Sequence, residues 1–202
     1  MKENSKHAGH EVLVKQHLYH LVSLCITLRV LITIIALLAS YLPAFDSSAD
    51  ILLADKDPSL LKRWTYTSLR WDTFHFLHIA QENYQFEYEW AFFPGVPLFL
   101  RATGWIMDFL TRNADGPSTY SMLLGHFLFS SVMSCETVRT LYLLTMEHTQ
   151  RPALSLLSGY LFLLSSSPAT AHLAPYTEPW FALFSYKGMR NLSTRTYRRV
   201  LK

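Results

Sequence analysis

The stretch LVSLCITLRVLITIIALLASYL, residues Leu21–Leu42, decides the fold class of this chain. It has 22 residues and one charged side chain, Arg29. At about 1.5 Å of rise per residue, a helix of this length crosses a hydrocarbon core about 30 Å thick. Backbone amides in lipid must find partners within their own segment, which a helix provides. The sequence therefore predicts a transmembrane helix over residues 21–42.

Three further apolar segments predict an all-α, polytopic membrane protein. Residues 122–146 carry two charges, Glu136 and Arg139, which lie on one helical face and can neutralise each other. Residues 153–174 carry no Asp, Glu, Lys or Arg. Residues 91–110 contain two prolines and two charged residues, so this segment either crosses the membrane or forms a re-entrant or interfacial helix.

The composition agrees with a membrane protein. Half of the residues are hydrophobic and 16% are charged, whereas soluble domains average about 25% charged residues. The two cysteines, Cys25 and Cys135, fall inside apolar segments. We interpret them as packing residues and not as a disulfide or a pair of metal ligands.

The orientation follows from the lysines in residues 1–20, which the positive-inside rule places in the cytoplasm. Residues 43–90 then lie on the far side, which is the lumen in a eukaryotic secretory membrane. If residues 91–110 cross, residues 175–179 face the cytosol; if they do not, residues 175–179 are luminal. Arg101 favours the second arrangement, because a central Arg costs roughly 2.5–3.5 kcal/mol on insertion scales.

The luminal segment, residues 43–90, holds twelve charged residues in 48, together with a run of aromatic residues from Trp64 to Trp90. Trp and Tyr prefer the membrane–water boundary, so interfacial helices are expected here. Such a surface suits a substrate that has a polar head group and a lipid tail.

The tripeptide Arg70-Trp71-Asp72 is the first candidate for chemistry. A carboxylate in a polar pocket at the interface can act as a general base. Arg70 can keep that carboxylate ionised or bind a phosphate group. Asp72 is also well placed as the N-cap of a helix over residues 74–84, and the two roles can coexist.

His75 and His78 lie three residues apart on that expected helix. They resemble half of a metal site, but no second pair has ligand spacing, so packing or phosphate contact is expected and no metal. Glu87 and Glu89 face the same side if the chain is extended there. They are either paired catalytic acids or solvated loop charges.

Glu178 lies between Pro175 and Pro179 in an otherwise apolar region. The residue before a proline avoids helical geometry, so a helix break that exposes Tyr176 and Glu178 is expected. An acidic group at such a break is either a functional residue or part of a plain loop between helices.

These motifs occur in a recognisable order. Arg70-Trp71-Asp72 comes first, an acidic stretch then runs into Ala91-Phe92-Phe93-Pro94-Gly95-Val96-Pro97, and Ser167-Pro168-Ala169 leads to Ala174-Pro175-Tyr176-Thr177-Glu178-Pro179-Trp180-Phe181-Ala182-Leu183. Over roughly residues 21–188 the chain resembles the GPI mannosyltransferase 2 family, in its fungal branch. Members of this family add the second mannose to the GPI precursor.

The resemblance implies the N-terminal part of a GT-C-type glycosyltransferase, a multi-pass protein of the endoplasmic reticulum membrane with a long first luminal loop. The donor would be dolichyl-phosphate mannose, the acceptor the GPI precursor, and the reaction a luminal α-1,6 transfer without a cofactor. A small accessory membrane subunit is a further expected partner. The resemblance implies catalytic roles for Asp72, Glu87 and Glu178, and substrate contacts for Arg70, Trp71, His75 and Tyr176.

The chain departs from the family pattern in two ways. Tyr88 stands where members often have His after the first acidic residue. Members are also longer, and the resemblance is expected to end near Gly188 with a truncated helix, followed by a basic tail at residues 189–202. Beside a membrane, such a tail indicates attraction to anionic lipid or an accidental terminus, and no contact with nucleic acid is expected. The alternative to an active enzyme is an inactive truncated fragment or a non-catalytic membrane scaffold subunit.

Overall fold

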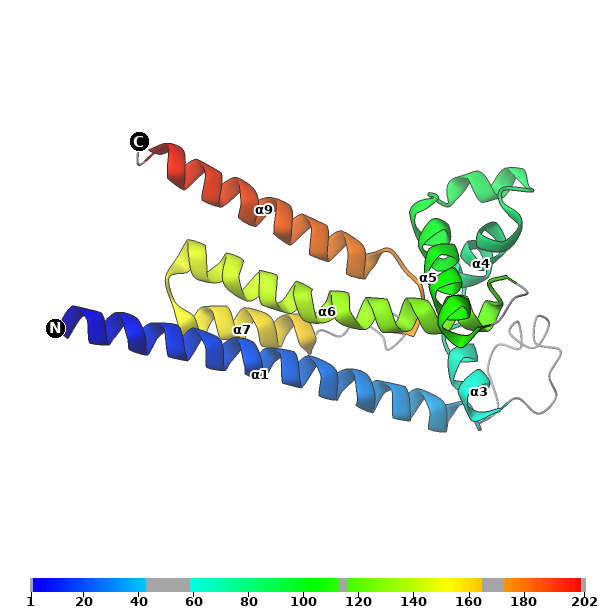
Figure 1. The fold of residues 1–202 in the computed structure, drawn as a ribbon, viewed down its shortest axis with the longest axis horizontal. Coiled ribbons are helices and arrows are strands. Elements are labelled where there is room, and N and C mark those ends of the chain that lie inside the picture. Colours follow the sequence, from blue (N-terminus) through cyan, green and yellow to red (C-terminus); the bar gives the residue numbers. More distant parts are fainter. Residues whose placement is uncertain (1, 43–58, 113–115, 165–172, 201–202) are drawn as a thin grey trace. The chain divides into compact units, whose positions relative to one another are not determined.

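The computed structural model describes residues 2–42, 59–112, 116–164 and 173–200, and every regular element in these ranges is helical. The elements in chain order are α1 (Lys2–Ala39), α3 (Leu60–Tyr66), α4 (Thr73–Glu82), the 3-10 helix η1 (Glu87–Ala91), α5 (Gly95–Thr111), α6 (Thr119–Thr149), α7 (Pro152–Leu163) and α9 (Glu178–Val200) (Figure 1). The predicted all-α class is confirmed for this part of the chain. Residues 43–58 of the luminal segment, the Ser167-Pro168-Ala169 motif and the last two residues of the tail lie outside the described residues.

Helix α1 contains the segment from which the fold class was predicted. It is continuous over 38 residues and begins well before Leu21, at Lys2. Its portion Gly9–Ala39 is the one helix in the described ranges that is long and apolar enough to cross a membrane. Only 17% of its apolar window is buried, as expected for a helix that contacts lipid.

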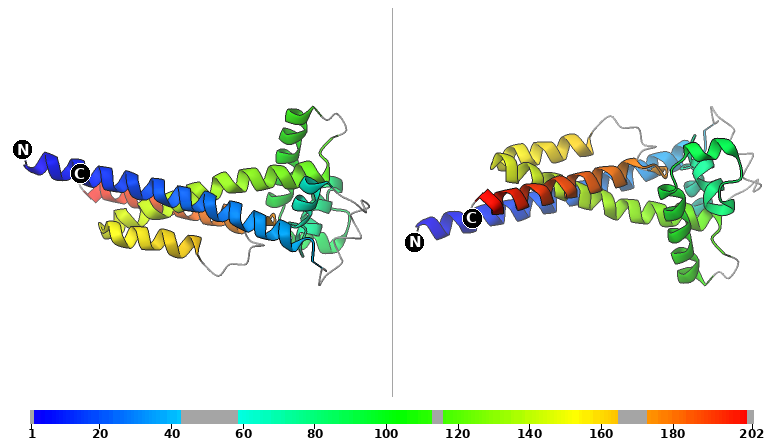
Figure 2. Two further views of the ribbon diagram at one scale, coloured as in Figure 1. Left: turned by 90° about the horizontal axis from the view of Figure 1, so that it is seen from below. Right: turned by 90° about the horizontal axis from the view of Figure 1, so that it is seen from above.

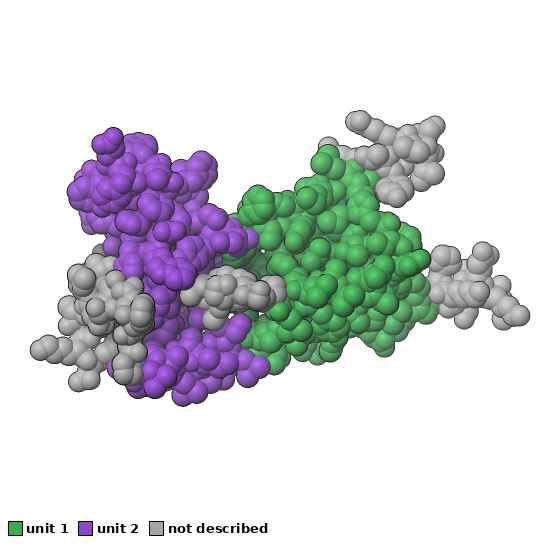
Figure 3. Space-filling view, turned by 180° about the vertical axis from the view of Figure 1, so that it is seen from behind, with its two compact units in different colours: residues 1–29, 131–166, 179–202 green, residues 30–130, 167–178 purple. Residues whose placement is uncertain are grey.

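The chain forms two compact units (Figure 3). The first unit comprises residues 1–29, 131–166 and 179–202, and the second comprises residues 30–130 and 167–178. Helices α1 and α6 each contribute one part to each unit.

In the first unit, α1 packs closely against α6 and α7 (Figure 2). A Cβ atom on Gly159 would lie 2.7 Å from Leu21 Cδ1, so glycine permits this close approach. Arg29 is buried, and it donates hydrogen bonds to the hydroxyls of Ser131 at 2.8 Å and Ser134 at 3.0 Å. The one charge of the expected span therefore faces the helix bundle, as intramembrane charges usually do.

The first unit also holds the two cysteines. Cys25 is buried in its hydrophobic core and Cys135 packs against that core. Both are free thiols. A small, soft side chain of this kind fills space between closely packed helices.

Helix α9 does not end near Gly188 as expected but continues to Val200. Ion pairs with α6 stabilise this continuation. Lys187 Nζ lies 3.6 Å from Glu136, which also pairs with Arg139 at 3.1 Å, and Arg190 Nε lies 2.7 Å from Glu147. The predicted pairing of Glu136 with Arg139 is present, and two of the basic residues near the tail are bound to carboxylates of the protein.

Helix α7 is shorter than the segment expected over residues 153–174. It covers 12 residues and ends at Leu163, where the Leu164 amide bonds to the Tyr160 carbonyl at 2.8 Å. The twelve residues span about 18 Å, less than a hydrocarbon core of about 30 Å.

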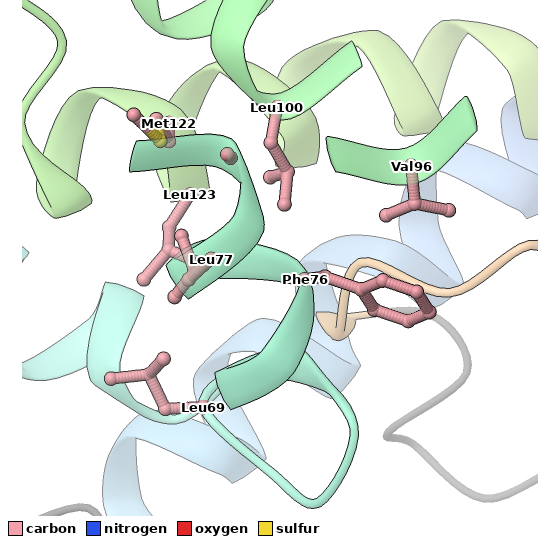
Figure 4. Packing of buried hydrophobic residues seen from close by; sticks show 8 residues of the cluster. Leu69, Phe76, Leu77, Val96, Leu100, Met122 and Leu123 are labelled. Carbon is pink, nitrogen blue, oxygen red and sulfur yellow. The ribbon is translucent and has the colours of Figure 1, made fainter. Parts of the chain in front are cut away.

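The core of the second unit holds α4 against α5 and the start of α6 (Figure 4). Its buried members are Leu69, Phe76, Leu77, Ala80, Val96, Leu100, Met122 and Leu123. Full burial of one such large side chain contributes about 1.5–3 kcal/mol. This core fixes the helix at whose start Asp72 lies.

Helix α5 is 17 residues long and covers most of the segment 91–110, whose path the sequence left open. Arg101 turns toward the end of α4 and donates to the carbonyls of Ala80 at 2.6 Å and Ile79 at 3.2 Å. Asp108 is buried and accepts a hydrogen bond from the Ser121 hydroxyl. Both charges of the segment are thus turned inward. At about 1.5 Å per residue the helix is about 25 Å long, shorter than a typical span.

Candidate active site

The turn formed by Arg70, Trp71, Asp72 and Thr73 carries the first sequence motif. The Arg70 carbonyl accepts the Thr73 amide at 3.0 Å and closes the turn. Trp71 has a φ of 45°, a left-handed conformation that costs a non-glycine residue roughly 1–2 kcal/mol. Its indole is 65% exposed. Strained residues of this kind cluster at functional sites, which marks the turn as a candidate.

Asp72 occupies the N-cap position of α4, but its side chain makes no capping hydrogen bond. Its φ of −62° and ψ of −15° are helical, whereas a capping side chain needs an extended backbone to reach the next turn. The predicted capping role is therefore wrong. The carboxylate is exposed and not engaged by its own helix.

Arg70 does not neutralise Asp72 in this structure. Its guanidinium donates to the neighbouring carbonyl of Leu69 at 3.0 Å. No ion pair between Arg70 and Asp72 occurs in the described ranges. The arginine is half-buried beside the turn, where it remains a candidate for a phosphate group.

Tyr176, which is 106 residues further along the chain, reaches the same turn. Its hydroxyl donates to the Arg70 carbonyl at 3.3 Å, and its ring packs edge-on against Phe76 with centroids 6.5 Å apart. Burial raises the pKa of Tyr176, and the nearby Asp72 carboxylate raises it further. The phenol therefore stays a hydrogen-bond donor at neutral pH. The Arg70-Trp71-Asp72 motif and the segment around Tyr176 therefore lie together in the structure.

Glu87 and Glu89 do not lie on the same side of the chain, and that prediction is wrong. They belong to η1, whose period of three residues per turn separates positions two apart. Glu87 is exposed, whereas Glu89 is fully buried. Glu87 thus remains a candidate at the surface, and Glu89 is a structural residue.

Three donors surround the Glu89 carboxylate. His78 Nδ1 lies 2.5 Å from one oxygen, and the amides of Gln85 and Phe86 donate to the other at 2.7 and 3.0 Å. Burial alone would raise the pKa of Glu89, but these hydrogen bonds outweigh it, and the pKa lies below its usual value. The carboxylate stays ionised and organises the loop that carries Glu87 and Tyr88.

His75 lies between two aromatic rings of that loop. It stacks on Phe92 at 4.6 Å between centroids and meets Tyr88 edge-on at 5.6 Å. The rings fix the imidazole one helical turn beyond Asp72, on the same side of α4. This position suits a contact with a substrate phosphate near the carboxylate.

Glu178 is the first residue of α9 and is exposed. A negative charge in the first turn is favoured by the helix dipole. Its charge also contributes to the raised pKa of Tyr176, after burial and Asp72, so it lies within electrostatic reach of the same phenol. The structure thus brings Asp72, Tyr176 and Glu178 into one neighbourhood.

The sequence did not reveal the roles of Glu89 and Arg101. Both act through backbone groups of α4 or its loop, and the only available signal was a charged residue in an aromatic or apolar setting. Among the described residues, no group of three or more His, Cys, Asp or Glu lies close enough to hold a metal ion.

The described ranges thus show a helical membrane protein whose acidic and aromatic side chains gather around the start of α4. A family profile described as Mannosyltransferase (PIG-V) matches residues 15–201. The chain belongs to this family. The match extends beyond Gly188, where the resemblance had been expected to end, in agreement with the continuation of α9.

Curated relatives carry related names. GPI mannosyltransferase 2 of Cryptococcus neoformans var. neoformans serotype D is 31% identical over 174 residues, which cover 86% of this chain and 38% of the relative. GPI alpha-1,6-mannosyltransferase 2 of Cricetulus griseus is 36% identical over 126 residues, which cover 61% of this chain and 24% of the relative. The chain therefore spans less than half the length of these relatives. No solved structure matches.

Proposed function

We propose that this chain carries the catalytic residues of an α-1,6-mannosyltransferase that adds the second mannose of the GPI anchor. The donor is dolichyl-phosphate mannose and the acceptor is the GPI precursor. The observation that carries the proposal is the Asp72 carboxylate, which is exposed and makes no capping hydrogen bond. It lies on a strained turn to which the Tyr176 hydroxyl donates a hydrogen bond. The reaction class, mannosyl transfer, is inferred from membership of the Mannosyltransferase (PIG-V) family.

In this mechanism Asp72 accepts the proton of the attacking acceptor hydroxyl. The hydroxyl oxygen bonds to the anomeric carbon of mannose as the bond from that carbon to the phosphate oxygen breaks, and dolichyl phosphate leaves. A positioned general base contributes about 10²–10⁴-fold to such a rate. Arg70 and His75 offset charge on the departing phosphate, and the exposed indole of Trp71 flanks the sugar. Glu87 and Glu178, whose side chains are both exposed, are further candidate catalytic carboxylates.

We further propose that the protein has a GT-C-type, multi-pass arrangement in the endoplasmic reticulum membrane, with α5 remaining on the luminal side. The hydrogen bond between Tyr176 and Arg70 supports this arrangement, because it requires residues 70 and 176 to lie on the same side of the membrane. The length of α5 and the inward direction of Arg101 agree with it. The lysines at the start of α1 then lie in the cytoplasm.

The partners in this proposal are the lipid-linked donor, the GPI-precursor acceptor and a small accessory membrane subunit. The alternative is a non-catalytic scaffold or an inactive fragment. The enzyme proposal and this alternative differ in whether the chain itself transfers mannose. One experiment in cells distinguishes between them.

Expression of the chain alone in cells that lack the second mannosylation step is expected to restore GPI-anchored protein at the surface. The physical reason is that the turn, Tyr176 and the loop held by Glu89 all belong to this one chain. Flow cytometry of a GPI-anchored reporter measures the outcome. A chain that reaches the endoplasmic reticulum at normal abundance, yet leaves the precursor with a single mannose, would support the scaffold.

A further inference from the structure

The strained conformation of Trp71 needs a stabilising contact, because left-handed backbone at a bulky residue is unfavourable by itself. The Arg70 carbonyl precedes the strained residue directly. It accepts two hydrogen bonds, one from the Thr73 amide at 3.0 Å and one from the Tyr176 hydroxyl at 3.3 Å. The first lies within the turn, and the second joins the turn to a distant segment of the chain.

The Tyr176 side chain is well supported for this task. Its ring packs on the core of the second unit, edge-on to Phe76. The residues before it, Leu173, Ala174 and Pro175, are buried. The phenol oxygen is therefore placed by packing and does not depend on the turn for its own position.

We propose that Tyr176 is a positioning residue, whose hydroxyl holds the Arg70–Thr73 turn in its strained form and so sets the direction of the Asp72 carboxylate. This inference rests on the proposed function, but it changes the role of Tyr176 from a substrate contact to a support for the general base. It also explains why the segment around Tyr176 lies against the Arg70–Thr73 turn, since the Tyr176 hydroxyl stabilises the conformation of that turn.

The test removes one oxygen atom. Tyr176→Phe keeps the ring against Phe76 and deletes the hydrogen bond to Arg70. The loss of one neutral hydrogen bond is expected to speed amide exchange in peptides covering residues 69–76 by roughly fivefold to tenfold. Hydrogen–deuterium exchange with mass spectrometry on the full chain in nanodiscs measures it. Tyr160→Phe is the matched control, because Tyr160 has a 2.7 Å hydrogen bond to His20 in the other unit. It should leave this peptide unchanged.

A second comparison isolates the strain. Trp71→Ala keeps the left-handed penalty, whereas Trp71→Gly removes it, and both lack the indole. Added to Trp71→Ala, the Tyr176→Phe change is expected to accelerate exchange at residues 69–76. Added to Trp71→Gly, it is expected to change exchange there by less than about twofold. Equal acceleration in both double variants, or none in either, would overturn the proposal.

Mannosyl transfer separates this inference from the proposed function. In the protein that retains Trp71, Tyr176→Phe is expected to lower kcat by roughly tenfold while KM changes less than about twofold, because the base is misdirected and substrate contacts remain. If exchange behaves as expected but kcat is unchanged, Tyr176 holds the turn without setting the direction of the Asp72 carboxylate, and that part of the proposal is overturned, whereas the base role of Asp72 itself is tested by Asp72→Asn. If exchange is unchanged, the positioning role itself is overturned.

Discussion

Asp72→Asn is expected to lower mannosyl transfer by about 10²–10⁴-fold, the contribution of a positioned general base. The substitution replaces one carboxylate oxygen with an NH2 group, which removes the basic site and leaves the side-chain volume nearly the same. Because the Asp72 side chain makes no capping hydrogen bond, its loss should not destabilise α4. Transfer of radiolabelled mannose in microsomes from cells that lack the second mannosylation step, and that express this chain, measures the effect.

Glu82→Gln provides the control for Asp72→Asn. Glu82 is the last residue of the same helix and its side chain is exposed, but it lies at the far end from the turn. This variant should keep the parent rate within about twofold, since isolated surface charges contribute little. If Asp72→Asn retained more than about a third of the parent rate, a general-base role worth about 10²-fold or more would be excluded.

Gly125→Ala is expected to be the most destabilising small substitution in the second unit. A Cβ atom at this position would lie 2.7 Å from the carbonyl oxygen of Thr103 and 2.8 Å from its carbonyl carbon. Backbone atoms of a packed helix cannot rotate away, so α5 and α6 must separate. Overpacking of this kind costs about 1–3 kcal/mol, which lowers Tm by roughly 3–10 °C for a chain of this size.

Gly188→Ala is the matched control, because no atom lies within 4 Å of a Cβ placed at that position of α9. Alanine is favoured over glycine inside a helix by up to about 1 kcal/mol, so Tm should stay the same or rise. Thermal unfolding of the full chain in detergent, followed by circular dichroism, compares the two variants. An equal loss of Tm in both would contradict the close approach of α5 and α6.

Much of the helical architecture was predictable, because apolar runs of helix length are a direct consequence of the lipid environment. The membrane-length helix was predicted from its composition, and α1 contains most of that segment. The ends of helices were predicted less well. Helix α9 continues past Gly188 because ion pairs with Glu136 and Glu147 stabilise it, and these partners are distant in sequence.

The candidate site shows a similar limit. Asp72 was singled out from its motif, but its backbone conformation, which excludes capping, is not readable from residue type. Glu87 and Glu89 were treated alike, since spacing alone cannot show that one carboxylate turns inward. The buried position of Glu89 depends on His78 and on two backbone amides, and these donors come together only when α4 and η1 have folded.

In the proposed arrangement, the first loop and the segment around Tyr176 form one site on one side of the membrane. Sided labelling tests it directly, with single cysteines introduced as Glu87→Cys, Glu178→Cys and Lys15→Cys and treated with a membrane-impermeant maleimide in sealed microsomes. Each variant is compared with the parent chain, because the parent contains Cys25 and Cys135. We expect the cysteines at positions 87 and 178 to be protected until the membrane is permeabilised, and the cysteine at position 15 to react at once. Labelling of position 178 in intact microsomes, with position 87 still protected, would place the two motifs on opposite sides of the membrane and rule out one shared site.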